Sequence, residues 1–171
     1  MRVEGTAAIV TGGGSGLGAA AARRLAAEGA KVALFDVNRE AAQAVAQEIG
    51  GLAVACNVAD ADSAVAAFAE ARAAHGPARI AVNCAGVATP GKVLGKDGPL
   101  ALDTFRRVVE VNLIGTFNIL RLAADDMAKL EPLEDGERGV VVNTASIAAF
   151  DGQIGQAAYA SSKGGVASLT L

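Results

Sequence analysis

The chain has 171 residues, of which 52% are hydrophobic and 19% are charged, and its formal net charge is −3. This length fits one domain, and enough apolar residues are present to bury a core, which excludes a disordered chain. Lys and Arg form no cluster, so the composition argues against nucleic acid as a main ligand.

In chain order, apolar runs of strand length alternate with segments of helical pattern. We expect a strand at 7–12, a helix at 16–28, a strand at 31–36, a helix at 39–49, a strand at 52–58, a helix at 60–75, a strand at 79–85, a long helix at 103–130, a strand at 139–146 and a helix from 157 onward. Continuously apolar strands are typical of strands buried on both faces. Strict alternation indicates βαβ units, so the sequence predicts an α/β fold with an open, doubly wound parallel sheet.

Two longer segments are predicted as loops. Ligands of such sheets bind at the carboxyl ends of the strands. Residues 87–102 follow the fourth strand and are therefore expected at the ligand end, whereas residues 131–138 precede the fifth strand and are expected at the opposite end.

The sequence shows no pattern typical of a signal peptide, a membrane span or a Cys/His metal site. The N-terminal residues lack the apolar run of a signal peptide, and the longest charge-free stretch, 5–22, is too rich in glycine for a membrane span. Cys56 and Cys84 lie in apolar runs, so we expect buried free thiols in a reducing compartment, the cytoplasm, rather than a disulfide. His75 precedes Gly-Pro, which is typical of a helix C-terminus. One His and two separated Cys exclude Ser-His-Asp triads, Cys-His dyads and Cys/His zinc sites.

The glycine-rich segment "TGGGSGLG" (11–18) joins the first strand to the first helix. Glycines in this position let the chain turn, let the helix pack on the strand and let a pyrophosphate approach the helix N-terminus. A purely structural turn is the alternative. The contact residues expected for a dinucleotide are Gly12, Ser15, Gly16, Leu17 and Gly18.

Asp36 ends the second strand, where a carboxylate can accept both hydroxyls of the adenosine ribose and repel a 2′-phosphate. Ser15 is not basic and offers no partner to that phosphate, so the sequence favours NAD over NADP. A capping Asp is the alternative.

Further contacts with the cofactor are expected at the ends of the third and fourth strands. Asn57 and Val58 can meet the adenine edge, although a local turn by Asn57 explains it equally well. In "NCAG" (83–86), the residues Asn83, Ala85 and Gly86 are predicted to lie beside the cofactor, with a simple strand-to-loop turn as the alternative.

The segment "YASSK" (159–163) places Tyr159 and Lys163 one helical turn apart. A free phenol has a pKa of about 10, and a neighbouring ammonium favours the phenolate, which can then accept the proton of an alcohol. Ser146, at the end of the fifth strand, can orient the substrate oxygen. Asn112 lies within an apolar helix; it is predicted either to hold a water that links Lys163 to solvent or to form a structural hydrogen bond.

Together, "TGGGSGLG", "NCAG", Asn112, Ser146 and "YASSK" resemble the short-chain dehydrogenase/reductase family. The resemblance implies a Rossmann-like sheet with strand order 3-2-1-4-5 and an Asn-Ser-Tyr-Lys tetrad. The segments "EVNLIGTFNILRL" and "GERGVVVNTASIAAFDGQIGQAAYASSKGG" are most similar to type II 3-hydroxyacyl-CoA dehydrogenases, homotetramers that oxidise 3-hydroxyacyl-CoA with NAD. By this resemblance Gln153 and Gln156 line the substrate pocket and residues 87–102 form one of its walls. Asn57 departs from the family, which usually has Asp there.

The resemblance also concerns the end of the chain. Family members continue the last helix and add two more strands, the sixth and seventh, so residues 1–171 are expected to be a single dinucleotide-binding and catalytic domain that is truncated at its C-terminus. Three functions stay open: a dehydrogenase of hydroxyacyl-CoA, one of hydroxysteroids or other secondary alcohols, and a nucleotide-binding fragment without turnover.

Overall fold

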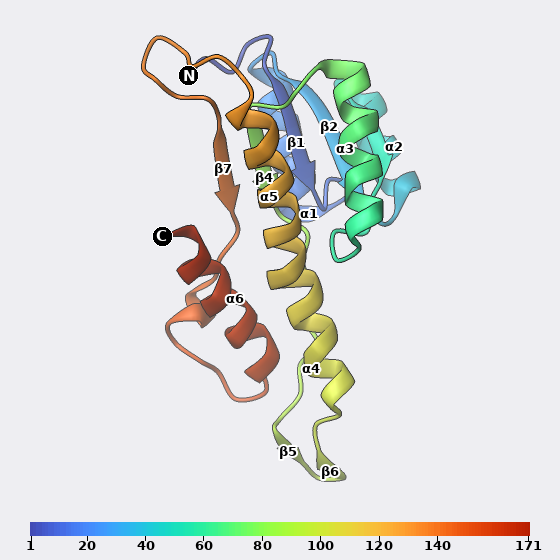
Figure 1. Ribbon diagram of the computed structural model, residues 1–171. Helices are drawn as coiled ribbons and strands as arrows, with labels where there is room; N and C mark the ends of the chain where they lie inside the picture. The colour runs from blue at the N-terminus through green and yellow to red at the C-terminus, as the bar shows by residue number, and fades with distance from the viewer.

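Five parallel strands form the central sheet of the computed structural model, which describes residues 1–171 (Figure 1). Their order is β3-β2-β1-β4-β7, and β7 is the fifth strand predicted from the sequence. The strands are β1 (Ala7–Thr11), β2 (Lys31–Asp36), β3 (Leu52–Ala55), β4 (Ile80–Asn83) and β7 (Val140–Asn143). The predicted doubly wound α/β fold and its strand order are confirmed, with several strands shorter than expected.

Six helices flank the sheet, and two of them begin at a side-chain cap. They are α1 (Gly16–Ala27), α2 (Arg39–Ile49), α3 (Ala61–His75), α4 (Leu102–Val109), α5 (Gly115–Ala128) and α6 (Ala157–Thr170). Asn38 and Asp60 accept backbone N–H groups at the first turns of α2 and α3, and Gly50 ends α2 in the left-handed conformation. His75 is the last residue of α3, as predicted.

The predicted long helix at 103–130 is confirmed as one unbroken helical run over 102–128, and its middle contains a π-helical turn that was not predicted. A π-helical turn, η1 (Glu110–Ile114), separates α4 from α5, and the N–H of Gly115 reaches back to the oxygen of Glu110. Asn112 lies in this turn and is fully buried.

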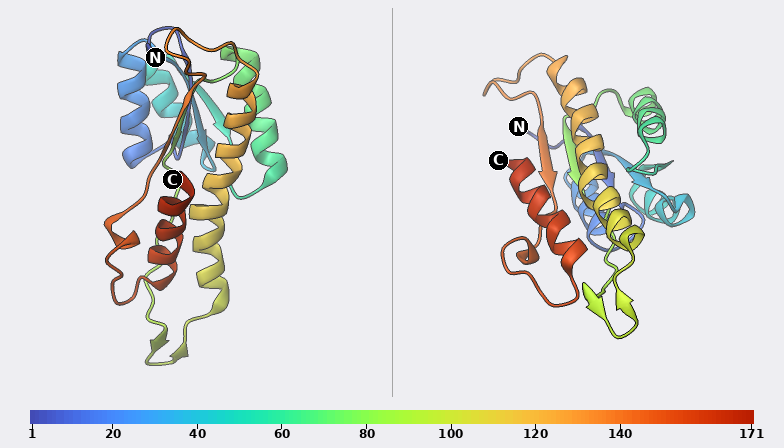
Figure 2. Two further views of the ribbon diagram at one scale, coloured as in Figure 1. Left: turned by 60° about the vertical axis from the view of Figure 1, so that its left-hand side comes forward. Right: turned by 60° about the horizontal axis from the view of Figure 1, so that its bottom comes forward.

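Helices cover both faces of the sheet, and each face has its own core. One core packs β1 and β2 against α1 and α2 through residues such as Val10, Leu34 and Val45. The other packs the opposite face against α3 and α5, with Phe35 and Phe68 in an edge-to-face pair. The sheet therefore places the carboxyl ends of its strands at one end of the molecule, where α4 and α6 lie (Figures 1 and 2).

Strand β7 departs from the expectation that every strand is buried on both faces. It lies at the edge of the sheet and pairs only with β4. Val140 and Val142 remain 41% and 49% exposed, whereas all residues of β1 are buried. Edge strands with apolar residues are surfaces that other segments or chains can cover.

The segment 87–102, predicted as a loop, contains a short antiparallel hairpin of β5 (Leu94–Gly95) and β6 (Gly98–Pro99). The hairpin projects from the ligand end of the sheet, and the loop at 131–138 lies at the opposite end, as expected (Figure 1). The N–H of Gly91 donates to the oxygen of Gly155 at 2.7 Å, which ties this segment to the turn before α6.

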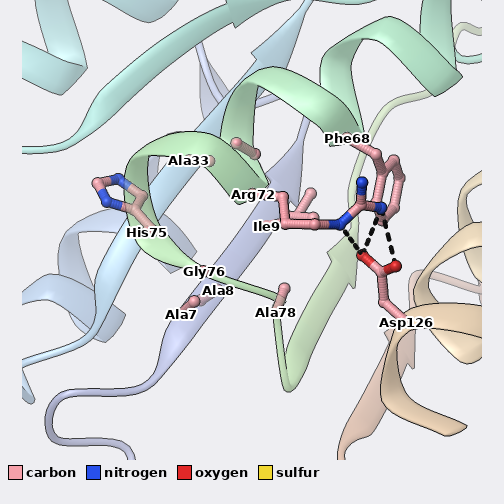
Figure 3. A pocket seen from close by; sticks show the side chains of 11 residues that line it. Ala7, Ala8, Ile9, Ala33, Phe68, Arg72, His75, Gly76, Ala78 and Asp126 are labelled. Carbon is pink, nitrogen blue, oxygen red and sulfur yellow. Dashed lines mark hydrogen bonds and ion pairs between the residues drawn. The ribbon is translucent and has the colours of Figure 1, made fainter. Parts of the chain in front are cut away.

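A small cavity of about 10 Å³ lies near the C-terminal end of α3 (Figure 3). Beside it Arg72 donates to both oxygens of Asp126, which is 7% exposed, at 2.8 and 3.0 Å through Nη2. This ion pair joins α3 to α5. None of the helices is both long and apolar enough to cross a membrane.

Candidate functional site

A cleft of about 620 Å³ opens at the carboxyl ends of the strands. Most residues predicted to contact a dinucleotide line it: Gly12, Ser15, Gly16, Leu17, Gly18, Asp36, Asn57, Val58, Ala85 and Gly86. They come from the ends of four strands, so only the sheet topology brings them together.

The glycine-rich loop leads from β1 directly into the N-terminus of α1. A Cβ on Gly18 would lie 2.1 Å from the oxygen of Gly12, so only glycine permits this approach of helix and strand. Gly16 has a φ of +50° and open space where a side chain would stand. The first turn of α1 carries no acidic residue, and no side chain caps it. Its free N–H groups therefore face the cleft as an anion site of the kind that binds pyrophosphate.

Asp36 is held rigidly at the end of β2. Its Oδ2 accepts the N–H of Gly14 and its Oδ1 accepts the N–H of Asn38, both at 2.9 Å. Asp36 does not cap α2, since Asn38 does, and these two contacts hold the loop between β2 and α2 instead. Each carboxylate oxygen keeps a further lone pair for a hydroxyl in the cleft.

Asn57 forms the local turn that the sequence left open as an alternative. Its Oδ1 accepts the N–H of Ala59 at 3.1 Å, and its own N–H donates to Oγ of Ser63. The side chain nevertheless lines the cleft beside Val58, with its amide nitrogen available as a donor.

Asn83 lies inside the sheet and does not line the cleft. It is 3% exposed, and its Nδ2 donates to Oδ1 of Asn143 on the neighbouring strand at 2.9 Å. Thr11, its partner on β1, accepts the N–H groups of Cys84 and Ala85 through its hydroxyl. These contacts fix the start of the loop whose later residues, Ala85 and Gly86, form the cleft wall.

Both cysteines are free, but the expectation that both are buried is wrong for Cys84, which is half-buried. Cys84 lines the cleft because it follows the last residue of β4. Cys56 is buried, and burial raises the pKa of its thiol to about 11.

Lys163 and Tyr159 lie together on the first two turns of α6. The Nζ of Lys163 is 5.8 Å from the centre of the Tyr159 ring and donates to the main-chain oxygen of Thr144 at 2.6 Å. Lys163 is 6% exposed, and this burial lowers the pKa of its ammonium. A Cβ on Gly86 would lie 3.9 Å from Nζ, so the ammonium stands directly behind the wall of the cleft.

Asn112 makes structural hydrogen bonds with all of its side-chain polar atoms. Oδ1 accepts the N–H of Val87 at 2.8 Å, and Nδ2 donates to the oxygen of Val87 and to Oγ of Ser162, both at 3.0 Å. These contacts match the structural alternative given by the sequence. The water link between Asn112 and Lys163 stays a prediction.

Ser146 and the two glutamines lie on the segment between β7 and α6. Ser146 caps a short turn, η2 (Ile147–Ala149), by accepting the N–H of Ala148 at 3.2 Å, so its hydroxyl proton remains free to donate. Gln156 precedes α6 and is half-buried, whereas Gln153 is exposed. Both lie on the segment that the Gly91–Gly155 hydrogen bond ties to residues 87–102, and the substrate pocket expected there stays a prediction.

Several residues at the site were not predicted from the sequence. Arg107 and Glu110 of the α4–η1 helix line the cleft, Thr144 receives the ammonium of Lys163, and Ser162 contacts Asn112. The position of Ser162 within "YASSK" was the only available signal. No group of three His, Cys, Asp or Glu side chains lies close enough together to hold a metal ion.

The chain is similar in sequence and in structure to known dehydrogenases. A family model described as short chain dehydrogenase matches residues 6–171. The 3-hydroxyacyl-CoA dehydrogenase type-2 of Homo sapiens is 45% identical over 173 residues, which cover 99% of this chain and 66% of that protein. A crystal structure of 3-hydroxyacyl-CoA dehydrogenase type-2 from Mycobacterium avium is 42% identical with a TM-score of 0.88, covering 96% of this chain and 66% of that one. A structure named ribose-5-phosphate isomerase from Brucella melitensis 16M is 38% identical with a TM-score of 0.86, covering 99% and 62%. The chain thus spans just under two thirds of the length of these relatives.

Proposed function

Because this chain belongs to the short-chain dehydrogenase family, we propose that the protein is an NAD-dependent oxidoreductase acting on a secondary alcohol, a 3-hydroxyacyl-CoA in the first instance. The observation that carries the proposal is the position of the Lys163 ammonium directly behind the wall of a cleft whose lining suits a dinucleotide, with the centre of the Tyr159 ring 5.8 Å from that ammonium.

The residues of the cleft fit NAD. The uncapped N-terminus of α1 suits the pyrophosphate, and the fixed carboxylate of Asp36 suits the hydroxyls of the adenosine ribose. The same carboxylate would repel the 2′-phosphate of NADP. When bound, NAD supplies the acceptor for the hydride that leaves the alcohol carbon.

The side chains of the chain itself handle the proton. Tyr159 accepts the alcohol proton as the carbon is oxidised and returns it to the ketone in the reverse direction. The ammonium of Lys163 stands 5.8 Å from the centre of the Tyr159 ring, where its positive charge can stabilise the charge that develops as the proton moves. The free hydroxyl proton of Ser146 can donate to the substrate oxygen and hold it against Tyr159.

Similarity to two proteins named 3-hydroxyacyl-CoA dehydrogenase type-2 supports the acyl-CoA class of substrate. Hydroxysteroids and other secondary alcohols use the same groups and remain the alternative substrates. A sugar-phosphate isomerase, the activity named for one structural neighbour, moves a proton within its substrate and has no need of a dinucleotide cleft. A cytoplasmic location and a homotetramer are parts of the same proposal, and the exposed residues Val140, Val142, Ile114 and Phe117 offer surfaces that further copies could cover.

Replacing Tyr159 with Phe tests the proposal. Turnover of 3-hydroxyacyl-CoA, followed by NADH absorbance, should fall below a few per cent of that of the unmodified protein, because the ring stays but the hydroxyl that moves the proton is lost. NADH binding, followed by fluorescence, should be nearly unchanged. Lys163→Ala should impair both measurements, because we expect its ammonium both to stabilise the charge on Tyr159 and to hold the nicotinamide ribose hydroxyls.

The outcomes separate the candidate functions. Turnover of a steroid alcohol but not of the acyl-CoA would replace the substrate class, and NADH binding without turnover of any alcohol would favour the nucleotide-binding fragment. Substantial activity in Tyr159→Phe would show that another group is the base.

A further inference from the structure

Ser162 connects the catalytic helix to the π-helical turn. It is completely buried on α6, directly before Lys163 and one turn after Tyr159. Its Oγ donates to the main-chain oxygen of Tyr159 at 2.8 Å and accepts from Nδ2 of Asn112 at 3.0 Å. A single hydroxyl thus joins the helical turn that carries both reactive side chains to a different element, η1.

Asn112 extends this connection to the cleft. It clamps both polar main-chain atoms of Val87, and Val87 follows Gly86 in the cleft wall. A continuous path of hydrogen bonds therefore runs from the cleft wall through Asn112 and Ser162 to the backbone of Tyr159. Such paths fix the relative positions of the elements that they join.

The local packing leaves room only for a short side chain at this position. One turn after Ser162, a Cβ on Gly165 would lie 2.7 Å from the side chain of Leu113, so α6 and η1 approach closely. An alanine would fill the same space at position 162 but would leave Asn112 without this partner. The hydroxyl is therefore what distinguishes serine from alanine at position 162, because the small volume of the side chain would be met by either residue.

We propose that Ser162 is a positioning residue that sets where Tyr159 and Lys163 stand relative to the cofactor cleft. Its effect on turnover rests on the proposed function, whereas its coupling of α6 to Val87 does not. Ser162 does not face the cleft, so it acts through the backbone of Tyr159 and through Asn112.

The test compares Ser162→Ala with Ser161→Ala, because Ser161 is the exposed neighbour on the same helix and loses the same hydroxyl. In Ser162→Ala we expect hydrogen exchange at the amide of Val87 to be about 3- to 10-fold faster, as fits the loss of one net hydrogen bond. The kcat, calculated per mole of NADH-binding sites, should fall about 10- to 100-fold, as fits a misplaced reactive group. The Kd for NADH and the KM for the alcohol should stay within about twofold, since uniform binding is not affected. Ser161→Ala should match the unmodified protein in each measurement.

Loss of stability alone would lower the melting temperature without this selective loss of kcat. Should Ser162→Ala not fold, Ser162→Cys gives the same comparison, because a thiol keeps the volume and is only a weak donor. Equal Val87 exchange in the Ser162 and Ser161 variants overturns the coupling, and equal kcat overturns the positioning role. A protein without any dehydrogenase activity would defeat the proposed function, and the exchange comparison would still decide the coupling.

Discussion

Replacing Asp36 with Asn should weaken NAD binding and strengthen NADP binding relative to it. The carboxylate is fixed by the N–H groups of Gly14 and Asn38, each at 2.9 Å, so it cannot turn away from a ligand in the cleft. An amide of the same shape loses the charge and can accept only one of these two N–H groups, because its nitrogen is a donor. The variant therefore changes the electrostatics of the cleft while keeping its volume.

The expected magnitude follows from the contacts. Hydrogen bonds to a charged group contribute about 1.5–3 kcal/mol, which corresponds to a rise in Kd for NAD of about 10- to 150-fold. Removing one unit charge about 5 Å from a phosphate relieves about 1–3 kcal/mol of repulsion per phosphate charge at intermediate dielectric. The Kd for NADP should therefore fall while that for NAD rises.

Titration calorimetry with each cofactor measures both changes. A gain in NADP affinity cannot come from partial unfolding, which makes the direction of that change informative. Asp62→Asn is the matched control, because Asp62 carries the same charge in the exposed first turn of α3, outside the cleft. Equal affinity of the unmodified protein for NAD and NADP, or an Asp36→Asn variant with an unchanged ratio, would falsify the assignment of NAD.

Two further predictions concern burial. Burial raises the pKa of the Cys56 thiol from 9.0 to about 11, so its thiolate fraction at pH 8 is about 100-fold below that of a free thiol. Alkylation followed by mass spectrometry should therefore modify Cys84 before Cys56. Equal labelling of both cysteines in the folded protein would contradict this. Asp126→Ala should lower the free energy of unfolding by about 2 kcal/mol, because the bonds to Arg72 are lost but Arg72 can be hydrated. The neighbouring Asp125→Ala, which removes an exposed ion pair with Lys129, should cost no more than about 0.5 kcal/mol in the same urea titration, and equal losses would refute the distinction.

The sequence predicted the nucleotide-binding half of the fold well, because short-range signals determine it. Apolar runs gave the strands, and the segments of helical pattern between them gave the helices. Position and spacing gave the candidate residues Asp36, Tyr159 and Lys163, and the resemblance to the family gave the strand order. The order of elements and the fold class are confirmed by the sheet and by the similarity to solved structures.

Where the sequence-based prediction missed a feature or was wrong, the feature depends on contacts between segments that are distant in the chain. The long helix through Asn112 was predicted correctly, but the π-helical turn within it was not; there the Asn112 side chain bonds to Val87 and Ser162, which lie on other segments. Cys84 was expected to be buried because its neighbours are apolar. Its place just beyond the end of β4 exposes it to the cleft instead.

By itself, the sequence determined which residue types could carry the chemistry: one tyrosine with a lysine a turn later, a carboxylate after the second strand, and glycines before the first helix. Only the tertiary structure decided how they act together, because the cleft draws on the ends of four strands that are far apart in the chain. It also decided the environment of Lys163, whose ammonium is buried against the oxygen of Thr144, and the role of Ser162, whose hydroxyl meets Asn112 across a gap of 50 residues. Periodicity and spacing describe contacts within an element, whereas burial and hydrogen bonds between elements exist only once the elements have packed.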